Sequence, residues 1–390
     1  MSAVSIYTGY CMKQHNRLFA PIMAIMVILS SCSKESLTLS TDQANTSKTE
    51  DAGFVYLESN ESKGNTIIIY KQHKDGSLEY YTSVETGGTG TGNDLGSEGS
   101  VILNADHSRL FAVNAGSNSI SSFELDDQGS LYLKCIVSSG GLMPVSVTEH
   151  GNFLYVVNSA TANITGFAIK SNGTLTPIPG SAQSLSAANA APAEIMFKPD
   201  GLELAVTEKT TNNITVFQVK NGVAAVGSSY PSHGQTPFGF QFLGSTALVV
   251  SNAASEVAGG SSVTSYYDKC GNPHVDGPKT NSQTGSGRLV IATNNYVYIT
   301  NTGSNTISSY TLDDGGLIEL THAVACVTDK EPTDVVLSGD DQAYLYNINS
   351  LSHSITEYST NADGTLTLIG HIDGLPPHAA GLAAYMESVQ

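Results

Sequence analysis

Basic residues are scarce in this sequence. Lys and Arg number 17 against 35 Asp and Glu, which leaves a formal net charge of −18, and no stretch gathers the basic residues into a stripe. A nucleic-acid partner needs such a stripe to neutralise its phosphates, so we exclude nucleic acid. The acidic surplus favours solubility but identifies no ligand.

Cysteine is also rare, and three of the five cysteines lie beyond residue 52: Cys135, Cys270 and Cys326. An odd number excludes a complete disulfide framework. Apart from Cys270 and His274, which we interpret as a turn thiol beside a surface histidine, no His or Cys residues lie at metal-ligand spacing. We therefore predict neither a metal site nor a cofactor.

Long hydrophobic runs are missing as well, apart from residues 18–29. This run is too short for an ordinary membrane span, and it follows Lys13 and Arg17, as the apolar part of a cleaved secretion signal does. We predict a signal peptide over residues 1–31, with Met12 the better candidate for the true start.

The sequence Leu29-Ser30-Ser31-Cys32 resembles a bacterial lipobox, in which the cysteine is acylated and becomes the mature N-terminus. We predict lipidation of Cys32 and a polar, disordered tether over residues 32–52. The protein would then lie in the bacterial cell envelope and contact the membrane only through its lipid anchor. Plain secretion with cleavage at another site is the alternative.

The sequence does contain one repeat that occurs seven times. Each copy has a β-branched run, an Asn or Glu anchor, a polar turn, a run ending in an aromatic residue, and a Gly turn. The anchors are Glu58, Asn114, Asn158, Glu208, Asn252, Asn301 and Asn347, at steps of 44 to 56 residues. This period is typical of a four-stranded propeller blade.

The two ends of the repeat complement each other. The first unit begins at Phe54 without an opening strand, and residues 377–385 remain after the last unit as an orphan opening strand. We predict an all-β, seven-bladed β-propeller over residues 53–386, with four-stranded antiparallel blades and blade 1 closed by the C-terminal strand. The alternative, an open β-solenoid, needs caps instead of an orphan strand.

In such a ring, the anchors and the starts of the opening strands meet at one face, around the central funnel. We interpret the Asn anchors as structural, because a short amide at a strand end bonds the next turn. Charged or aromatic groups around a concave mouth are candidates for binding. The ligand-binding candidates are Glu58, Glu194, Phe238 and Asp334. The catalytic candidates are Glu208, Arg288 and His378.

Three stretches resemble the lactonase-type propellers, which include propeller 6-phosphogluconolactonase and carboxy-muconate lactonising enzyme: residues 191–201, 206–209 and 235–240. The resemblance covers about residues 53–386 and implies the same seven-bladed fold. It also implies an Arg-His pair where Ala193-Glu194 stands here, and a neighbouring His where Pro144-Val145-Ser146 stands. The family's Glu at the following strand end is matched by Glu208.

Because these positions differ, the sequence favours an envelope propeller that binds a small acidic or sugar-derived ligand, or a protein partner, without catalysis. The alternative is a lactone hydrolase or a muconate-cycloisomerase-like enzyme. In that case Glu208 would act as general base, Arg288 as the clamp for an anion and His378 as an acid.

Overall fold

The structure, a computed structural model, describes residues 51–269 and 271–386. The predicted signal peptide, Cys32, Cys270 and all of the tether up to residue 50 lie outside this part of the chain. No helix within it is long and apolar enough to cross a membrane.

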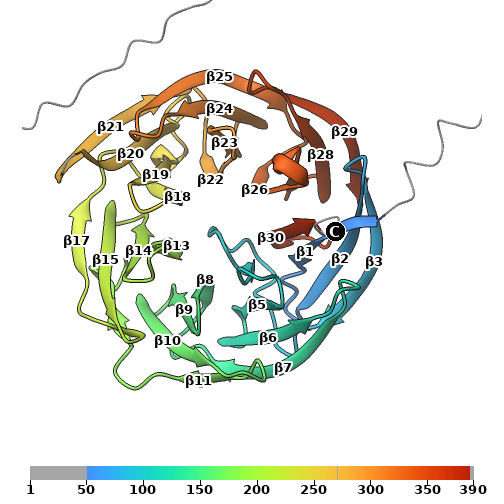
Figure 1. Ribbon diagram of the computed structural model, residues 1–390, viewed down its shortest axis with the longest axis vertical. Coiled ribbons are helices and arrows are strands. Elements are labelled where there is room, and N and C mark those ends of the chain that lie inside the picture. Colours follow the sequence, from blue (N-terminus) through green and yellow to red (C-terminus); the bar gives the residue numbers. More distant parts are fainter. Residues whose placement is uncertain (1–50, 270, 387–390) are drawn as a thin grey trace, which may run out of the picture. The chain divides into compact units, whose positions relative to one another are not determined.

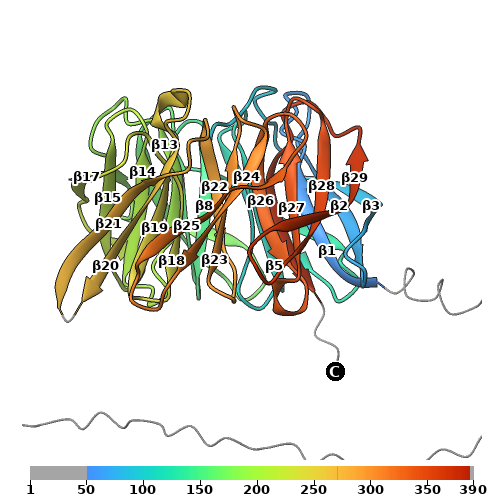
Figure 2. The ribbon, with the colours of Figure 1, turned by 90° about the horizontal axis from the view of Figure 1, so that it is seen from above.

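The described residues form seven antiparallel sheets arranged around a central axis (Figure 1), and the strands run along this axis in the side view (Figure 2). From the centre outward, blade 1 consists of β30 (Ala380–Met386), β1 (Asp51–Glu58), β2 (Thr66–His73) and β3 (Leu78–Glu85). Blade 2 consists of β4 (Val101–Leu103), β5 (Arg109–Asn114), β6 (Ser119–Leu125) and β7 (Leu131–Ser138). Blade 3 consists of β8 (Pro144–His150), β9 (Phe153–Asn158) and β10 (Asn163–Ile169), with β11 (Leu175–Pro177) and β12 (Gln183–Ser184) outside β10. Blade 4 consists of β13 (Pro192–Phe197), β14 (Glu203–Glu208) and β15 (Asn213–Lys220), with β16 (Val223–Ala224) and β17 (Ser228–Pro231) outside β15.

Blade 5 consists of β18 (Pro237–Leu243), β19 (Ala247–Asn252), β20 (Ser262–Lys269) and β21 (Asn272–Thr280). Blade 6 consists of β22 (Ser286–Ile291), β23 (Tyr296–Asn301), β24 (Thr306–Leu312) and β25 (Ile318–Val327). Blade 7 consists of β26 (Pro332–Ser338), β27 (Tyr344–Asn349), β28 (Ser354–Thr360) and β29 (Leu366–Asp373). Two short 3-10 turns, η1 (Ala254–Glu256) and η2 (Asp340–Gln342), complete the described elements.

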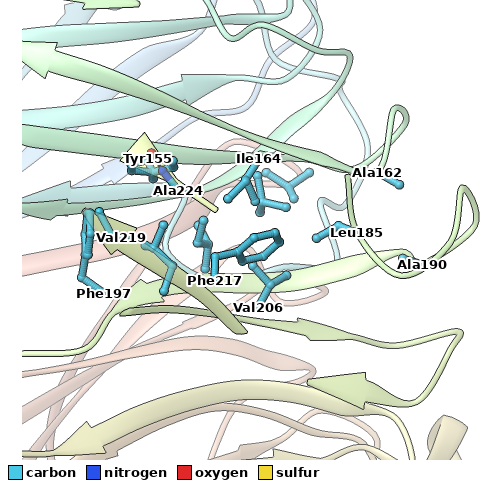
Figure 3. Close-up of a cluster of buried hydrophobic side chains, with 14 residues drawn as sticks. Tyr155, Ala162, Ile164, Leu185, Ala190, Phe197, Val206, Phe217, Val219 and Ala224 are labelled. Carbon is cyan, nitrogen blue, oxygen red and sulfur yellow. Dashed lines mark hydrogen bonds between the residues drawn. The ribbon is translucent and has the colours of Figure 1, made fainter. Parts of the chain in front are cut away.

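The hydrophobic core lies between neighbouring blades. One cluster joins Tyr155 and Ile164 of blade 3 to Phe197, Phe217 and Val219 of blade 4 (Figure 3). Each blade is apolar on both faces because it packs between two others, which explains why the second and third strands of the repeat are β-branched and aromatic.

The Gly hairpins belong to the same packing. Gly129 has a φ of +73°, and a Cβ there would lie 2.4 Å from the ring of Phe54 in blade 1. The hydroxyl of Tyr56 donates a 3.2 Å hydrogen bond to the Gly129 carbonyl. The repeat therefore needs Gly at this position both for the turn and for the close approach of the neighbouring blade.

The predicted closure of the ring is confirmed. β30 pairs antiparallel with β1, with Phe54 opposite Tyr385 and Glu58 opposite Ala380. Leu382, 3% exposed, packs into the apolar cluster between blades 1 and 7. The orphan strand thus supplies both a hydrogen-bonded edge and part of the core.

The predicted positions of two cysteines are confirmed, whereas the predicted anchor of blade 7 is not. Cys135 lies in β7 and Cys326 in β25, which are outer strands of blades 2 and 6 as predicted, and both thiols are free. The predicted anchor of blade 7 is wrong by two residues. Asn349, not Asn347, ends β27 and faces Pro332 of β26, as Asn301 faces Ser286 in blade 6.

Candidate functional site

The Asn anchors hold their own blades together. The Asn114 amide donates to the Ser121 hydroxyl at 2.8 Å, and Asn301 donates to Ser308 at 2.9 Å. Asn349 donates to Thr356 at 3.0 Å. In each case the acceptor is seven residues further on, in the third strand. The structural interpretation is therefore confirmed for Asn114 and Asn301, although the acceptor is a third-strand hydroxyl and not the next turn. Asn252 donates to the Thr264 hydroxyl at 3.1 Å, whereas Asn158 donates to the Ser139 carbonyl at 3.3 Å.

The two Glu anchors make the equivalent contact, but here the anchor accepts the hydrogen bond instead of donating it. The Asn65 amide donates to Glu58 at 2.7 Å, and the Thr215 hydroxyl donates to Glu208 at 2.5 Å. Glu208 also accepts from the Ser186 backbone N–H at 3.0 Å, the Ser186 hydroxyl and the Thr211 hydroxyl. Glu208 is fully buried, and both of its oxygens accept hydrogen bonds from blade 4 and from Ser186 in the preceding loop. In the sequence, the hydrogen-bonding side chain seven residues after each Glu anchor could have indicated this structural role.

A mouth cavity of about 210 Å³ lies where the anchors and opening strands converge. Three predicted site residues line it: Phe238, Asp334 and His378. Glu58, Glu194, Glu208 and Arg288 do not. Its other charged lining residues are Asp94, Glu98, Glu256 and Glu331, none of which the sequence analysis singled out.

Asp94 and Glu98 come from a bridging segment, residues 86–100, between β3 and β4. The Glu98 backbone N–H donates to the Ala193 carbonyl at 2.9 Å, and the Ser97 hydroxyl donates to the Val145 carbonyl at 3.0 Å. The segment therefore crosses the central ends of blades 3 and 4, and Figure 1 shows the chain between β3 and β4 reaching toward the axis. Two sequence signals could have revealed it: the 56-residue step between the first two anchors and the Gly-rich run within it.

Beneath the mouth cavity lies a charge cluster of three buried carboxyls, Glu98, Glu194 and Asp334, around Arg288, whose side chain is 16% exposed. Arg288 Nη1 lies 3.2 Å from Glu194 Oε1 and 3.9 Å from Glu98 Oε2, and its Nε lies 3.9 Å from Asp334 Oδ1. The structure thus brings together three predicted site residues with one that was missed. The predicted anion clamp, Arg288, is already paired with the protein's own carboxylates.

Burial dominates the electrostatics of this cluster. It raises the pKa of Glu194 to about 7, with Arg288 and the Phe240 N–H opposing the rise. It raises the pKa of Glu98 well above its usual range and also raises that of Asp334. Burial by itself would lower the pKa of Arg288, but the three carboxylates raise it, so the guanidinium stays charged.

The charge cluster separates two cavities. Glu98 and Asp334 line the mouth cavity, whereas Arg288 and Glu194 line a second cavity of about 180 Å³ deeper along the opening strands β4, β8 and β13. The cluster therefore forms the floor of the mouth cavity.

His378 lies at the wall of the mouth cavity, just before β30. Its Nδ1 is 2.7 Å from Oδ1 of Asp94 in the bridging segment, and its side chain is 38% exposed. Among the described residues, Nε2 has no hydrogen-bond partner. A carboxylate at one ring nitrogen leaves the other free to take or give a proton at the cavity.

Lys209 is a further residue that the sequence analysis did not assign to the mouth. Its Nζ donates to the Gly96 carbonyl of the bridging segment and lies 5.1 Å above the ring of Phe238. Burial lowers its pKa, and Glu98 opposes this change. Gly96 and Phe238 line the mouth cavity, while Lys209 is engaged with both of them.

In residues 51–269 and 271–386, no three His, Cys, Asp or Glu side chains form a group suited to a metal ion.

Glu58 offers a test of burial at this face. Burial raises its pKa to about 8, and the Asn65 hydrogen bond opposes the rise. Between its usual pKa and this value the folded state binds more protons than the unfolded state, so stability falls as pH rises. We expect Glu58→Gln to match the native chain at pH 5 and to exceed its free energy of unfolding by about 1–3 kcal/mol at pH 8. Denaturant unfolding from pH 5 to 8 measures this. Glu61→Gln is the control, because Glu61 is exposed. If the stability of Glu58→Gln fell with pH as steeply as that of the native chain, the raised pKa of Glu58 would be contradicted.

Solved structures share this architecture at low sequence identity. A proposed 6-phosphogluconolactonase of Bacteroides fragilis aligns with 19% identity and a TM-score of 0.67, covering 87% of this chain and 99% of that one. The periplasmic gluconolactonase PpgL of Pseudomonas aeruginosa aligns with 15% identity and a TM-score of 0.67, covering 86% and 99%. Virginiamycin B lyase of Staphylococcus aureus aligns with 13% identity and a TM-score of 0.53, covering 74% and 89%. These likenesses show the fold.

No curated protein matches the sequence. A family model does, described as lactonase, seven-bladed β-propeller, over residues 48–187 and 272–385. The unmatched stretch contains all of blade 4 and all but the last strand of blade 5, including Glu194, Lys209 and Phe238. The matched parts make up well over half of the chain, so this protein belongs to the lactonase family of seven-bladed β-propellers.

Proposed function

We propose that this protein hydrolyses a lactone in the mouth cavity. The observation that carries the proposal is the His378–Asp94 pair, 2.7 Å apart, at the wall of a cavity whose floor holds the buried carboxyl of Glu98. Membership of the lactonase family supports the same reaction and favours it over binding without turnover.

The reaction needs a base for water and an acid for the leaving oxygen. His378 Nε2 would take a proton from a water molecule whose oxygen attacks the lactone carbonyl carbon, while Asp94 holds Nδ1. The ring C–O bond then breaks, and its oxygen must receive a proton to leave as a hydroxyl group. The product is the open-chain hydroxy acid.

Glu98 is suited to supply that proton. It is 1% exposed, and burial raises its pKa well above its usual range, which favours the protonated form. Two ionisable groups in environments that separate their proton affinities form an acid and base pair. Arg288 acts as a positioning residue, because it contacts Glu98 and Asp334 from below the cavity floor.

The test is the hydrolysis of glucono-δ-lactone by the full chain, measured by the protons that the acid product releases. We expect activity above the buffer rate, and a loss of about 100-fold or more in kcat for His378→Ala. His371→Ala is the matched control, because His371 forms a similar pair with Asp373 at 3.0 Å on the outer strand β29. Equal loss in both variants, or none in His378→Ala, would contradict the role of His378.

Ligand binding without turnover is the second candidate. It is favoured by Ala193-Glu194, which stands where the family resemblance implies an Arg-His pair. If glucono-δ-lactone binds to the folded protein but is not hydrolysed, this function replaces the first.

We also propose that the protein lies in the cell envelope and is anchored there by a lipid on Cys32. The support is the lipobox-like sequence after a short apolar run. Cells that express the full chain should incorporate a palmitate analogue into it, and Cys32→Ser should abolish the label. Equal labelling of both chains would rule out the anchor.

A further inference from the structure

The lining of the mouth cavity carries one sign of charge. Five acidic side chains line it: Asp94, Glu98, Glu256, Glu331 and Asp334. His378 is the other titratable lining residue, and no Lys or Arg of the described chain joins it. From this lining we propose that the cavity takes a neutral, unphosphorylated sugar lactone and rejects lactones that carry a phosphate. The inference rests on the proposed function and names its substrate class.

Two cations next to the lining, Arg288 and Lys209, are already engaged. Arg288 contacts Glu98, Glu194 and Asp334 at 3.2 to 3.9 Å and lines the deeper cavity. Lys209 donates to the Gly96 carbonyl and covers the Phe238 ring. Charged side chains that bind phosphate in proteins are free Arg and Lys, and helix N-termini also bind it. Both described helical elements, η1 and η2, are three-residue turns and offer no such terminus.

The same lining suits a polyol. Carboxylates accept hydrogen bonds, and sugar hydroxyls donate them. Glu98 Oε2 is buried and accepts no hydrogen bond from the described residues, although it borders the cavity. The volume of about 210 Å³ lies below the roughly 300–1,000 Å³ of sites for drug-sized ligands, so the cavity fits a single sugar ring.

The charge on a phosphorylated substrate would meet the carboxylates of Glu256 and Glu331, since Asp94 is paired with His378 and Asp334 lies beside Arg288. Glu256 is exposed and Glu331 is half-buried, so this repulsion falls as salt rises. We therefore expect discrimination by charge that added salt weakens.

The test compares glucono-δ-lactone with its 6-phosphate on the full chain. We expect kcat/KM to favour the neutral lactone by at least about 100-fold at low salt, and by less at about 0.5 M NaCl. The double variant Glu256→Gln/Glu331→Gln should reduce the preference at least about fivefold. Asp127→Asn/Asp314→Asn, in hairpins at the opposite end of the ring, should leave it unchanged. A preference for the phosphorylated lactone, or none, would overturn the inference.

Binding of sorbitol and sorbitol 6-phosphate, measured by calorimetry, separates this inference from the proposed function. If neither lactone is hydrolysed but sorbitol binds at least tenfold more tightly than its phosphate, the catalytic proposal fails and the charge selectivity stands. Tighter binding of the phosphate, or binding of neither polyol, overturns the selectivity.

Discussion

Deleting residues 376–390 is expected to unfold the propeller. The deletion removes β30 and with it the hydrogen-bonded partner of β1. It also removes Leu382 and Ala383, which are 3% and 7% exposed and pack in the clusters on either side of blade 1. Loss of a buried Leu side chain costs about 2–5 kcal/mol, and the exposed edge of β1 adds to this. The sum is comparable with the whole stability of about 5–15 kcal/mol of a typical protein.

Thermal unfolding followed by circular dichroism measures the effect. The control is a chain that ends at Met386, because it keeps the whole of β30 and should melt as the native chain does. An unchanged melting temperature in the shorter chain would mean that ring closure does not stabilise the fold. A single substitution, Gly381→Ala, should act in the same direction, because Gly381 has a φ of +68° and a Cβ there would lie 2.4 Å from the Ser100 hydroxyl.

Replacing Arg288 by Met should destabilise the protein by about 3–5 kcal/mol at pH 8. The change keeps the length of the side chain but leaves Glu98, Glu194 and Asp334 buried without their cation. Without Arg288 the pKa of each carboxyl rises further, so the folded state holds protons that the unfolded state has lost. Stability therefore falls as pH rises, and the deficit should shrink toward pH 5, because protonation of the carboxyls removes the buried charge.

Denaturant unfolding at pH 5 and pH 8 gives the two differences in free energy. Lys279→Met is the matched control, because Lys279 pairs with Asp276 at 3.2 Å and Glu319 at 3.0 Å on an exposed outer strand. Such a surface pair contributes only about 0–1 kcal/mol. Equal losses in both variants, or a loss in Arg288→Met that does not change with pH, would show that the charge cluster is not a buried ion network.

The prediction of the ring succeeded because its signals are local and repeated. The spacing of the anchors, the Gly hairpins and the orphan strand after Leu375 each follow from the hydrogen bonding of one blade. The anchor of blade 7 was misplaced because Asn347 and Asn349 both fit the pattern. Only the pairing of Asn349 with Pro332 distinguishes them.

The candidate site was predicted less completely. Phe238, Asp334 and His378 follow from the rule that opening strands start at one face, and the structure places them at the mouth cavity. Glu98 and Asp94 escaped notice because their segment has no counterpart in the other repeats.

The sequence by itself determined the ring, the absence of a basic surface and the polar rim, since these depend on periodicity and composition. The tertiary structure decided which carboxyls share a cation, which histidine gains a carboxylate partner and which anchors are occupied within their blades. Those outcomes depend on contacts between residues far apart in the chain, such as Asp94 with His378 and Glu98 with Arg288. No spacing along one strand encodes such contacts, because the closed ring alone brings the strand ends together.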